Sequence, residues 1–288
     1  MLLFTAICAV GCGWLFRRVE QKRKEREAAE VLSKSGFLVT YDYQIDQKPN
    51  AEPPGPAWLR TLVGENFFCH VEVAQAFPPP IFGGGPRRRG PSDFEPSPAT
   101  DDDLSALDSL PNLRVLGLSS TKATDNALSH VCRLRNLRSL DLGWLNISDN
   151  GLQSLSALPL LEELGLDGTK ITDSGLKCFR TLVTVQTLSL ANTRITDNGL
   201  KELRGMHALQ VLDLRKTQIS DNGIEYLLDL PNLQVLDLSG TEITDSALEW
   251  LKELTQLRDL RIKNTRTTDI VVKKLRDSRR NCDLQIAH

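Results

Sequence analysis

The stretch LPLLEELGLDGTKITDSGLKCFRT, residues 158–181, decides the fold, because its 24-residue pattern fills the last two-thirds of the chain. Seven copies follow one another without insertion or deletion, and they begin at Leu110, Leu134, Leu158, Leu182, Met206, Leu230 and Leu254. A unit of this length cannot bury its own apolar side, so neighbouring copies must stack and cover one another. The repeat therefore predicts a solenoid.

Each copy has a strand half and a helical half. In the strand half, Val235-Leu236-Asp237-Leu238-Ser239 alternates apolar and polar residues, which predicts a short strand with one buried face. One strand per copy, always in the same direction, predicts a parallel sheet. In the helical half, Leu176, Phe179 and Leu182 are three residues apart, which predicts helical turns with one buried side. The predicted fold class is α/β.

A threonine, an aspartate and a small residue recur between the two halves. The threonine hydroxyl is expected to bond to the backbone of the turn, and Leu145 replaces it in one copy. The aspartate, as at Asp173, and the serine or threonine before it can each cap the helix that follows, and the aspartate is expected to be a cap. The small residue, as at Gly175, is expected to let adjacent turns approach closely. One carboxylate per copy does not supply the roughly six to eight oxygens that calcium needs, so metal binding by the row of aspartates is disfavoured.

The register extends the solenoid beyond the seven clear copies. Asp101 lies 24 residues before Asp125, and Ile286 lies 24 residues after Ile262. The solenoid is therefore predicted to cover residues 99–288, with irregular units at both ends.

The first repeat is predicted to contain an insertion. Its strand is best assigned to His70–Val73, and with Val73 as the last buried strand residue the repeat is 21 residues longer than the others. The proline-, glycine- and arginine-rich residues 77–98 account for this excess. Their composition does not support a packed core, so they are expected to loop out of the solenoid.

The beginning of the chain predicts a membrane anchor over residues 1–18. Leu2–Phe16 carry no charge, although such a helix spans only about 22 Å against the roughly 30 Å of a hydrocarbon core. Basic residues follow at once, and their bias places the rest of the chain in the cytoplasm: Arg17, Arg18, Lys22, Arg23, Lys24 and Arg26. An extracytoplasmic location, a lipoprotein attached through Cys12, and a soluble chain remain alternatives.

Residues 19–76 are predicted to form a basic helix and an N-terminal cap. The helical pattern continues to Leu32, Phe37–Tyr43 is a candidate strand, and residues 54–68 (PGPAWLRTLVGENFF) contain a proline-started helix. An open solenoid end exposes apolar surface, which a small α+β cap would cover.

The sequence offers no catalytic constellation. The six cysteines form no CxxC pair, the four histidines are scattered, and Gly83-Gly84-Gly85 is followed by proline instead of a phosphate-binding helix. The net charge of −2 does not indicate a polyanionic partner. We therefore expect no enzyme activity, no cofactor, no metal site and no nucleic-acid binding.

The string LxxLxLxxTxITDxGLxxL resembles the leucine-rich-repeat family, in its 24-residue subtype with threonine in the turn. The layout also resembles bacterial membrane-anchored leucine-rich-repeat proteins, including a PPGPxWLRxLxGxxFF segment like Pro53 to Phe68. This resemblance implies a solenoid with a curved parallel sheet on the concave side and short helices on the convex side, used for protein–protein recognition. Leu145 and residues 77–98 depart from the family pattern.

We therefore predict a membrane-tethered scaffold, held through residues 2–16, that binds a protein or peptide on its concave face. The alternative is an adaptor or substrate-recognition subunit, ligase-receptor-like, whose chemistry lies in a partner chain. The candidate binding residues are the charged positions that face outward from the strands and one nearby aromatic residue: Asp141, Trp144, Glu163, Asp167, Asp213, Arg215, Asp237, Asp259, Arg261 and Lys263.

Overall fold

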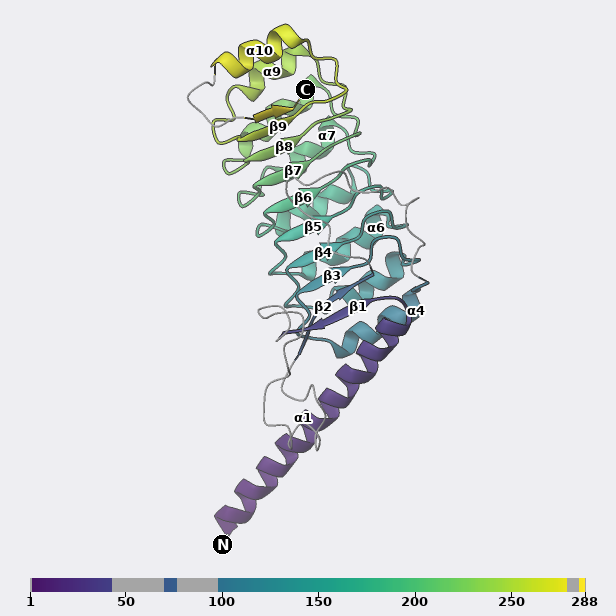
Figure 1. The fold of residues 1–288 in the computed structure, drawn as a ribbon. Coiled ribbons are helices and arrows are strands. Elements are labelled where there is room, and N and C mark those ends of the chain that lie inside the picture. The colour runs from purple at the N-terminus through teal and green to yellow at the C-terminus, as the bar shows by residue number, and fades with distance from the viewer. Residues whose placement is uncertain (1, 43–69, 77–97, 279–284, 288) are drawn as a thin grey trace.

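The computed structural model describes residues 2–42, 70–76, 98–278 and 285–287. In this part of the chain, ten strands form one sheet whose spatial order is their sequence order. The strands are β1 (Leu38–Tyr41), β2 (Val71–Gln75), β3 (Val115–Gly117), β4 (Ser139–Asp141), β5 (Glu163–Gly165), β6 (Thr187–Ser189), β7 (Val211–Asp213), β8 (Val235–Asp237), β9 (Asp259–Arg261) and β10 (Gln285–Ala287). Only β1 is antiparallel to its neighbour. The predicted solenoid is confirmed (Figure 1).

Helical segments cover one face of this sheet and leave the other face open. Short α-helices alternate with 3-10 turns because each copy has room for only one or two turns between strands. The α-helices are α1 (Leu2–Lys34), α4 (Asp101–Leu104), α5 (Leu128–Val131), α6 (Asp149–Leu152), α7 (Asp197–Leu200), α8 (Asp221–Ile224), α9 (Asp245–Leu251) and α10 (Asp269–Ser278). The 3-10 segments are η2 (Ser105–Ser109), η3 (Asp125–Ala127), η4 (Gln153–Ala157), η5 (Gly175–Thr181), η6 (Lys201–Leu203) and η7 (Glu225–Asp229).

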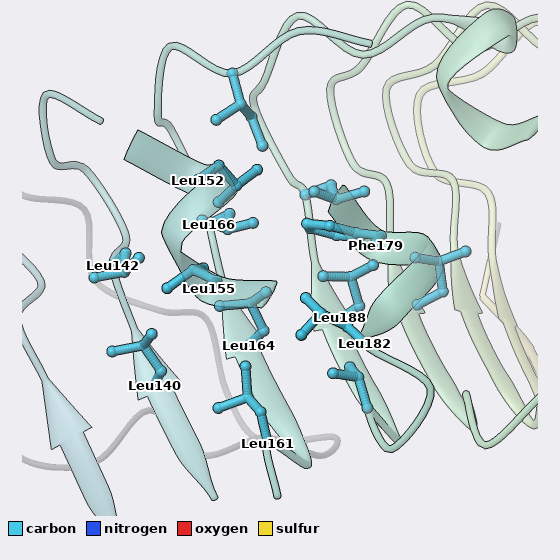
Figure 2. Close-up of a cluster of buried hydrophobic side chains, with 14 of the residues drawn as sticks. Leu140, Leu142, Leu152, Leu155, Leu161, Leu164, Leu166, Phe179, Leu182 and Leu188 are labelled. Carbon is cyan, nitrogen blue, oxygen red and sulfur yellow. The ribbon is translucent and has the colours of Figure 1, made fainter. Parts of the chain in front are cut away.

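The core lies between the strands and the helical turns. Figure 2 shows leucines of neighbouring strands on the helix side of the sheet, where they meet Leu152, Leu155 and Phe179. Leu164 pairs in register with Leu188, and both side chains are fully buried. Burying such a side chain contributes roughly 1.5–3 kcal/mol relative to leaving it exposed. The period-two alternation of the strands therefore places their leucines inside and their polar residues on the open concave face.

The recurring aspartates join successive repeats. Asp173 Oδ1 accepts a bond from the backbone N–H of Thr196 at 2.8 Å, and Asp173 Oδ2 accepts one from the Thr196 hydroxyl at 2.6 Å. The other links follow the same geometry: Asp101 to Thr124, Asp125 to Ser148, Asp149 to Thr172, Asp197 to Ser220, Asp221 to Thr244 and Asp245 to Thr268. The prediction that each aspartate caps its own helix is wrong, because its carboxylate reaches into the next repeat.

The glycines two places after the aspartate make room for this link in their copies. A Cβ on Gly199 would lie 2.5 Å from Asp173 Oδ1, and one on Gly223 would lie 2.4 Å from Asp197 Oδ1. Of the two residues that could cap the helix, the one before the aspartate takes this role. The Thr196 hydroxyl accepts from the Asn198 N–H at 3.3 Å. Close approach of adjacent turns, as predicted, is therefore required by the aspartate links.

The turn threonines bond to the backbone as expected. Thr169 Oγ donates to the Leu166 carbonyl at 2.7 Å, and Thr193, Thr217, Thr241 and Thr265 repeat this contact. At Leu145 the side-chain bond is missing, while the backbone N–H of Leu145 still donates to the Leu142 carbonyl at 3.4 Å. The leucine side chain is buried, so apolar packing replaces the hydroxyl bond in this turn.

The first repeat begins at β2, as predicted, but in a different register. Val73 pairs with Val115, which is 42 residues further on instead of 24, so this repeat is 18 residues longer than the others and not 21. Ala74 and Ala76 occupy the places of strand leucines. Alanine is only weakly apolar, and so the sequence pattern favoured Val71 and Val73 as the buried strand residues. The predicted helix within residues 54–68 and nearly all of the predicted insertion lie outside the described residues.

Helix α1 packs against this end of the stack through its second half. Ala28, Ala29 and Leu32 are buried in the common core, and β1 pairs with the outer edge of β2. The first half of α1 projects beyond the repeats (Figure 1). In the described part of the chain, no helix is both long enough and apolar enough to cross a membrane.

Candidate functional site

The concave face presents three outward positions per repeat. The first and third residues of each strand face outward, and so does the residue two places further on; Leu164 and its equivalents between them are buried. Parallel pairing stacks equivalent positions of neighbouring strands at roughly 4.8 Å. Nine of the ten predicted binding residues belong to this array, and Trp144 lies in the turn that follows β4.

The amino-terminal half of the array is acidic. The Gly143 N–H donates to Asp141 Oδ1 at 2.9 Å, and Ser139 Oγ donates to Glu163 Oε2 at 2.8 Å. The Ser189 hydroxyl donates to Asp167. Asp141 and Asp167 are buried, whereas Glu163 is half-buried. The hydrogen bonds fix these carboxylates in place, and Glu163 is the member of this half that is most open to a partner.

The carboxyl-terminal half is an interdigitated network of acids and arginines. Arg215 donates to both oxygens of Asp213, with Nε–Oδ1 and Nε–Oδ2 at 2.9 Å and Nη2–Oδ2 at 2.6 Å. Arg215 Nε also lies 3.5 Å from Asp237 Oδ2. Arg261 continues the network, with Nη2 at 2.7 Å from Asp259 Oδ2 and Nη1 at 4.0 Å from Asp237 Oδ2.

Burial and pairing set the charges in this network. The bond to Asp213 raises the pKa of Arg215 above its usual range, so its charge is fixed. Burial raises the pKa of the Asp237 carboxyl, although hydrogen bonds from Ser239 act in the opposite direction. Lys263 is exposed at the edge of the network. The carboxyl-terminal half thus offers partly exposed, preorganised charges of both signs.

Trp144 occupies an unusual backbone position. Its φ is +62°, and the equivalent turn residue of every copy from Ser120 to Asn264 also has positive φ. A left-handed backbone is costly for a bulky residue. The indole lies against Gly168 of the next turn, where an added Cβ would approach Trp144 Cε3 to 2.4 Å. Trp144 is nevertheless 45% exposed, so its indole is accessible to a partner beside the acidic half of the concave face.

The structure thus brings five of the predicted residues into one network and leaves the others in separate contacts. The network contains Asp213, Arg215, Asp237, Asp259 and Arg261. Sequence reasoning missed the serines that hold the buried acids, because a hydroxyl on an outward position looks like an ordinary solvent contact. It also missed two aromatic residues on the helices, Tyr226 and Trp250, although their separation of 24 residues is a signal in the sequence.

Cys178 lies on the helix side, in η5. Burial raises the pKa of Cys178 to about 11. This residue is therefore a thiol at neutral pH and a poor nucleophile.

Comparisons with known proteins agree with this geometry. Two family models, each described as leucine rich repeat, match the chain, one over residues 208–266 and the other over residues 133–156 and 181–203. The chain belongs to the leucine-rich-repeat family. Proteins of this family are protein-interaction scaffolds. No curated protein sequence matches the chain.

Solved structures of internalins are similar to this leucine-rich-repeat chain. Internalin C2 from Listeria monocytogenes is 30% identical, with a TM-score of 0.49, and the match covers 64% of this chain and 76% of that one. Internalin InlF from the same organism is 25% identical, with a TM-score of 0.50, over 64% of this chain and 56% of that one.

Proposed function

We propose that this protein is a scaffold that captures a protein or peptide on its concave face. The observation that carries the proposal is the preorganised charge network around Asp213 and Arg215, which lies on an open parallel sheet. Arginine and tryptophan are enriched among the residues that dominate binding energy. The half-exposed Trp144 lies in the turn after β4, next to the acidic half of this face. A ligand with an extended shape and charges of both signs fits this surface best.

The scaffold is further proposed to be tethered to a membrane through residues 2–16. The support comes from the uncharged run in these residues, from the basic residues directly after it, and from the direction of α1. A juxtamembrane basic cluster is attracted to anionic headgroups by roughly 1 kcal/mol per residue near the surface. Such a tether would leave the whole concave face available to a partner.

The binding proposal is tested by removing charges in pairs. The double change Asp213→Ala and Arg215→Ala deletes a whole ion pair instead of leaving one of its charges unpaired. Asp237 loses its contact with Arg215 in this variant, but it keeps the bond from the Ser239 N–H and the approach of Arg261. Trp144→Asn removes the indole but keeps a residue type that the equivalent Asn192 shows to tolerate this backbone. A partner is first captured with the full chain from a detergent extract. We expect each variant to raise the dissociation constant of this partner by about tenfold or more.

The matched control is an ion pair on the helix side. Arg180 Nε lies 2.6 Å from Glu202 Oε2, and Arg180→Ala with Glu202→Ala deletes this pair. Its removal should leave the affinity unchanged. Circular dichroism and melting temperatures establish that all variants are folded. If the helix-side variant abolishes capture while both concave variants bind normally, the concave-face proposal is wrong.

A further inference from the structure

A cavity of about 500 Å³ lies on the helix side, at the seam between two neighbouring repeats near the carboxyl-terminal end. It is lined by residues of α8, η7 and α9: Asp221, Asn222, Glu225, Tyr226, Ser246 and Trp250. Trp250 is 44% exposed. The cavity therefore combines an accessible indole, a phenol ring and two carboxylates, and it is separate from the concave face.

The equivalent aromatic ring of the preceding repeat, Tyr226, binds cations from the chain itself. The Tyr226 ring is covered by two cations, with Lys201 Nζ at 5.1 Å and Arg204 Cζ at 4.8 Å from its centroid. Cations at this separation from an aromatic face are attracted by the negative potential of the ring. The seam before Tyr226 thus contains an intramolecular cation–π site.

The next seam has the ring but lacks the cations. Trp250 stands 24 residues after Tyr226, and so it takes the same place in its repeat. The residues 24 after Lys201 and Arg204 are Glu225 and Leu228, a carboxylate and an apolar side chain. In the described ranges, the cation contacts found on Tyr226 have no counterpart on Trp250.

The charge around this cavity favours a cation from outside. Glu225 forms no ion pair with any described residue, whereas Glu249 on the same side is bound by Lys252. The Asp221 carboxylate accepts bonds from Thr244 and still contributes its negative charge. An aromatic face beside a free carboxylate suits arginine, because a guanidinium can stack on the ring and donate to the carboxylate at once.

We propose that this cavity binds an arginine side chain presented by a partner protein, with the guanidinium on the Trp250 ring and hydrogen-bonded to Glu225. The partner's arginine takes the place that Lys201 and Arg204 occupy on Tyr226 in the preceding repeat. This site is independent of the concave face, and so its partner need not be the ligand proposed for the strands.

The test uses the full chain labelled with 5-fluorotryptophan in a non-ionic detergent. A tripeptide with one arginine, acetyl-Gly-Arg-Gly-amide, is titrated against the protein, and its citrulline counterpart serves as the uncharged probe of the same shape. We expect a saturable shift of the Trp250 fluorine signal with the arginine peptide and none with the citrulline peptide. Trp144, whose exposure is nearly equal, provides the control signal in the same spectrum. Trp250→Phe identifies the signal that belongs to the cavity.

Three variants sharpen the test. Glu225→Gln should raise the dissociation constant of the arginine peptide by at least about threefold. Glu225→Lys should abolish binding, because the introduced lysine covers Trp250 as Lys201 covers Tyr226. Glu249→Gln, which removes a carboxylate outside the cavity lining, should leave binding unchanged. The proposal is overturned if the citrulline peptide shifts Trp250 equally, or if Glu225→Lys binds the arginine peptide as well as the unmodified chain does.

Discussion

Asp173 makes two hydrogen bonds to the next repeat, because each of its carboxylate oxygens accepts from Thr196. The recurrence of aspartate is visible in the sequence, but the direction of its bonds is not. A carboxylate at the start of a helix can cap that helix or reach a neighbour, and the choice depends on how closely the repeats stack. The glycines two places later were the better signal, because they mark where a neighbouring carboxylate needs room.

The aspartate links should contribute measurably to stability. Asp173→Ala leaves the part-buried N–H and hydroxyl of Thr196 without their acceptor, which should lower the free energy of unfolding by about 1–3 kcal/mol. Asp173→Asn keeps one carbonyl acceptor and should cost less. Urea unfolding followed by circular dichroism measures both variants. Equal stability of the alanine variant and the unmodified chain would show that the links are not needed.

Strands and helical turns follow from the repeat, and the irregular elements do not. The period of 24 residues predicted β3 to β9 and the last strand, β10, because every copy repeats the same leucine positions. The register of β2 was missed because Ala74 and Ala76 stand where leucines stand elsewhere. Tertiary packing settled that register, since α1 and the first repeat share one core.

Helix α1 is fastened to the first repeat by more than apolar contacts. Lys22 Nζ lies 2.7 Å from Glu25 Oε2 and 3.0 Å from His70 Nδ1, and Asn112 Nδ2 lies 2.8 Å from the same imidazole nitrogen. Lys22 and Glu25 are buried. The part of α1 that packs against the first repeat therefore begins at or before Lys22. This lies ahead of Ala28, Ala29 and Leu32, the residues of α1 that are buried in the apolar core.

These contacts predict where the chain can be shortened. A chain that begins at Arg17 should keep the melting temperature of the repeats, whereas one that begins at Ala28 loses Lys22 and Glu25 and should melt at a lower temperature. If residues 2–16 are the tether, the full chain should sediment with membranes in high salt and the chain from Arg17 should not. Recovery of the full chain in the soluble fraction would contradict the tether, and equal melting of both shortened chains would contradict the role of Lys22 and Glu25.

At the scale of the whole molecule, the contacts that hold the repeats together lie apart from the charges of the concave face. Leucines and aspartate links hold the repeats together on one side of the sheet, while the concave face carries charges that those links do not use. The sequence predicted which residues lie on this face, because strand alternation fixes their direction. It did not predict which carboxylates remain accessible, since Asp141 and Asp167 are covered by contacts from neighbouring strands and turns.

The most direct measurement compares two tryptophans on opposite sides of the solenoid. Trp144 beside the concave face is 45% exposed, and Trp250 on the helix side is 44% exposed, so free protein should show similar oxidation of both by hydroxyl radicals. The same labelling is then repeated on the complex with the captured partner, and the two sites are read by mass spectrometry. Binding on the concave face predicts that oxidation of Trp144 falls strongly on complex formation. Unchanged oxidation of Trp144 in a saturated complex would contradict the account.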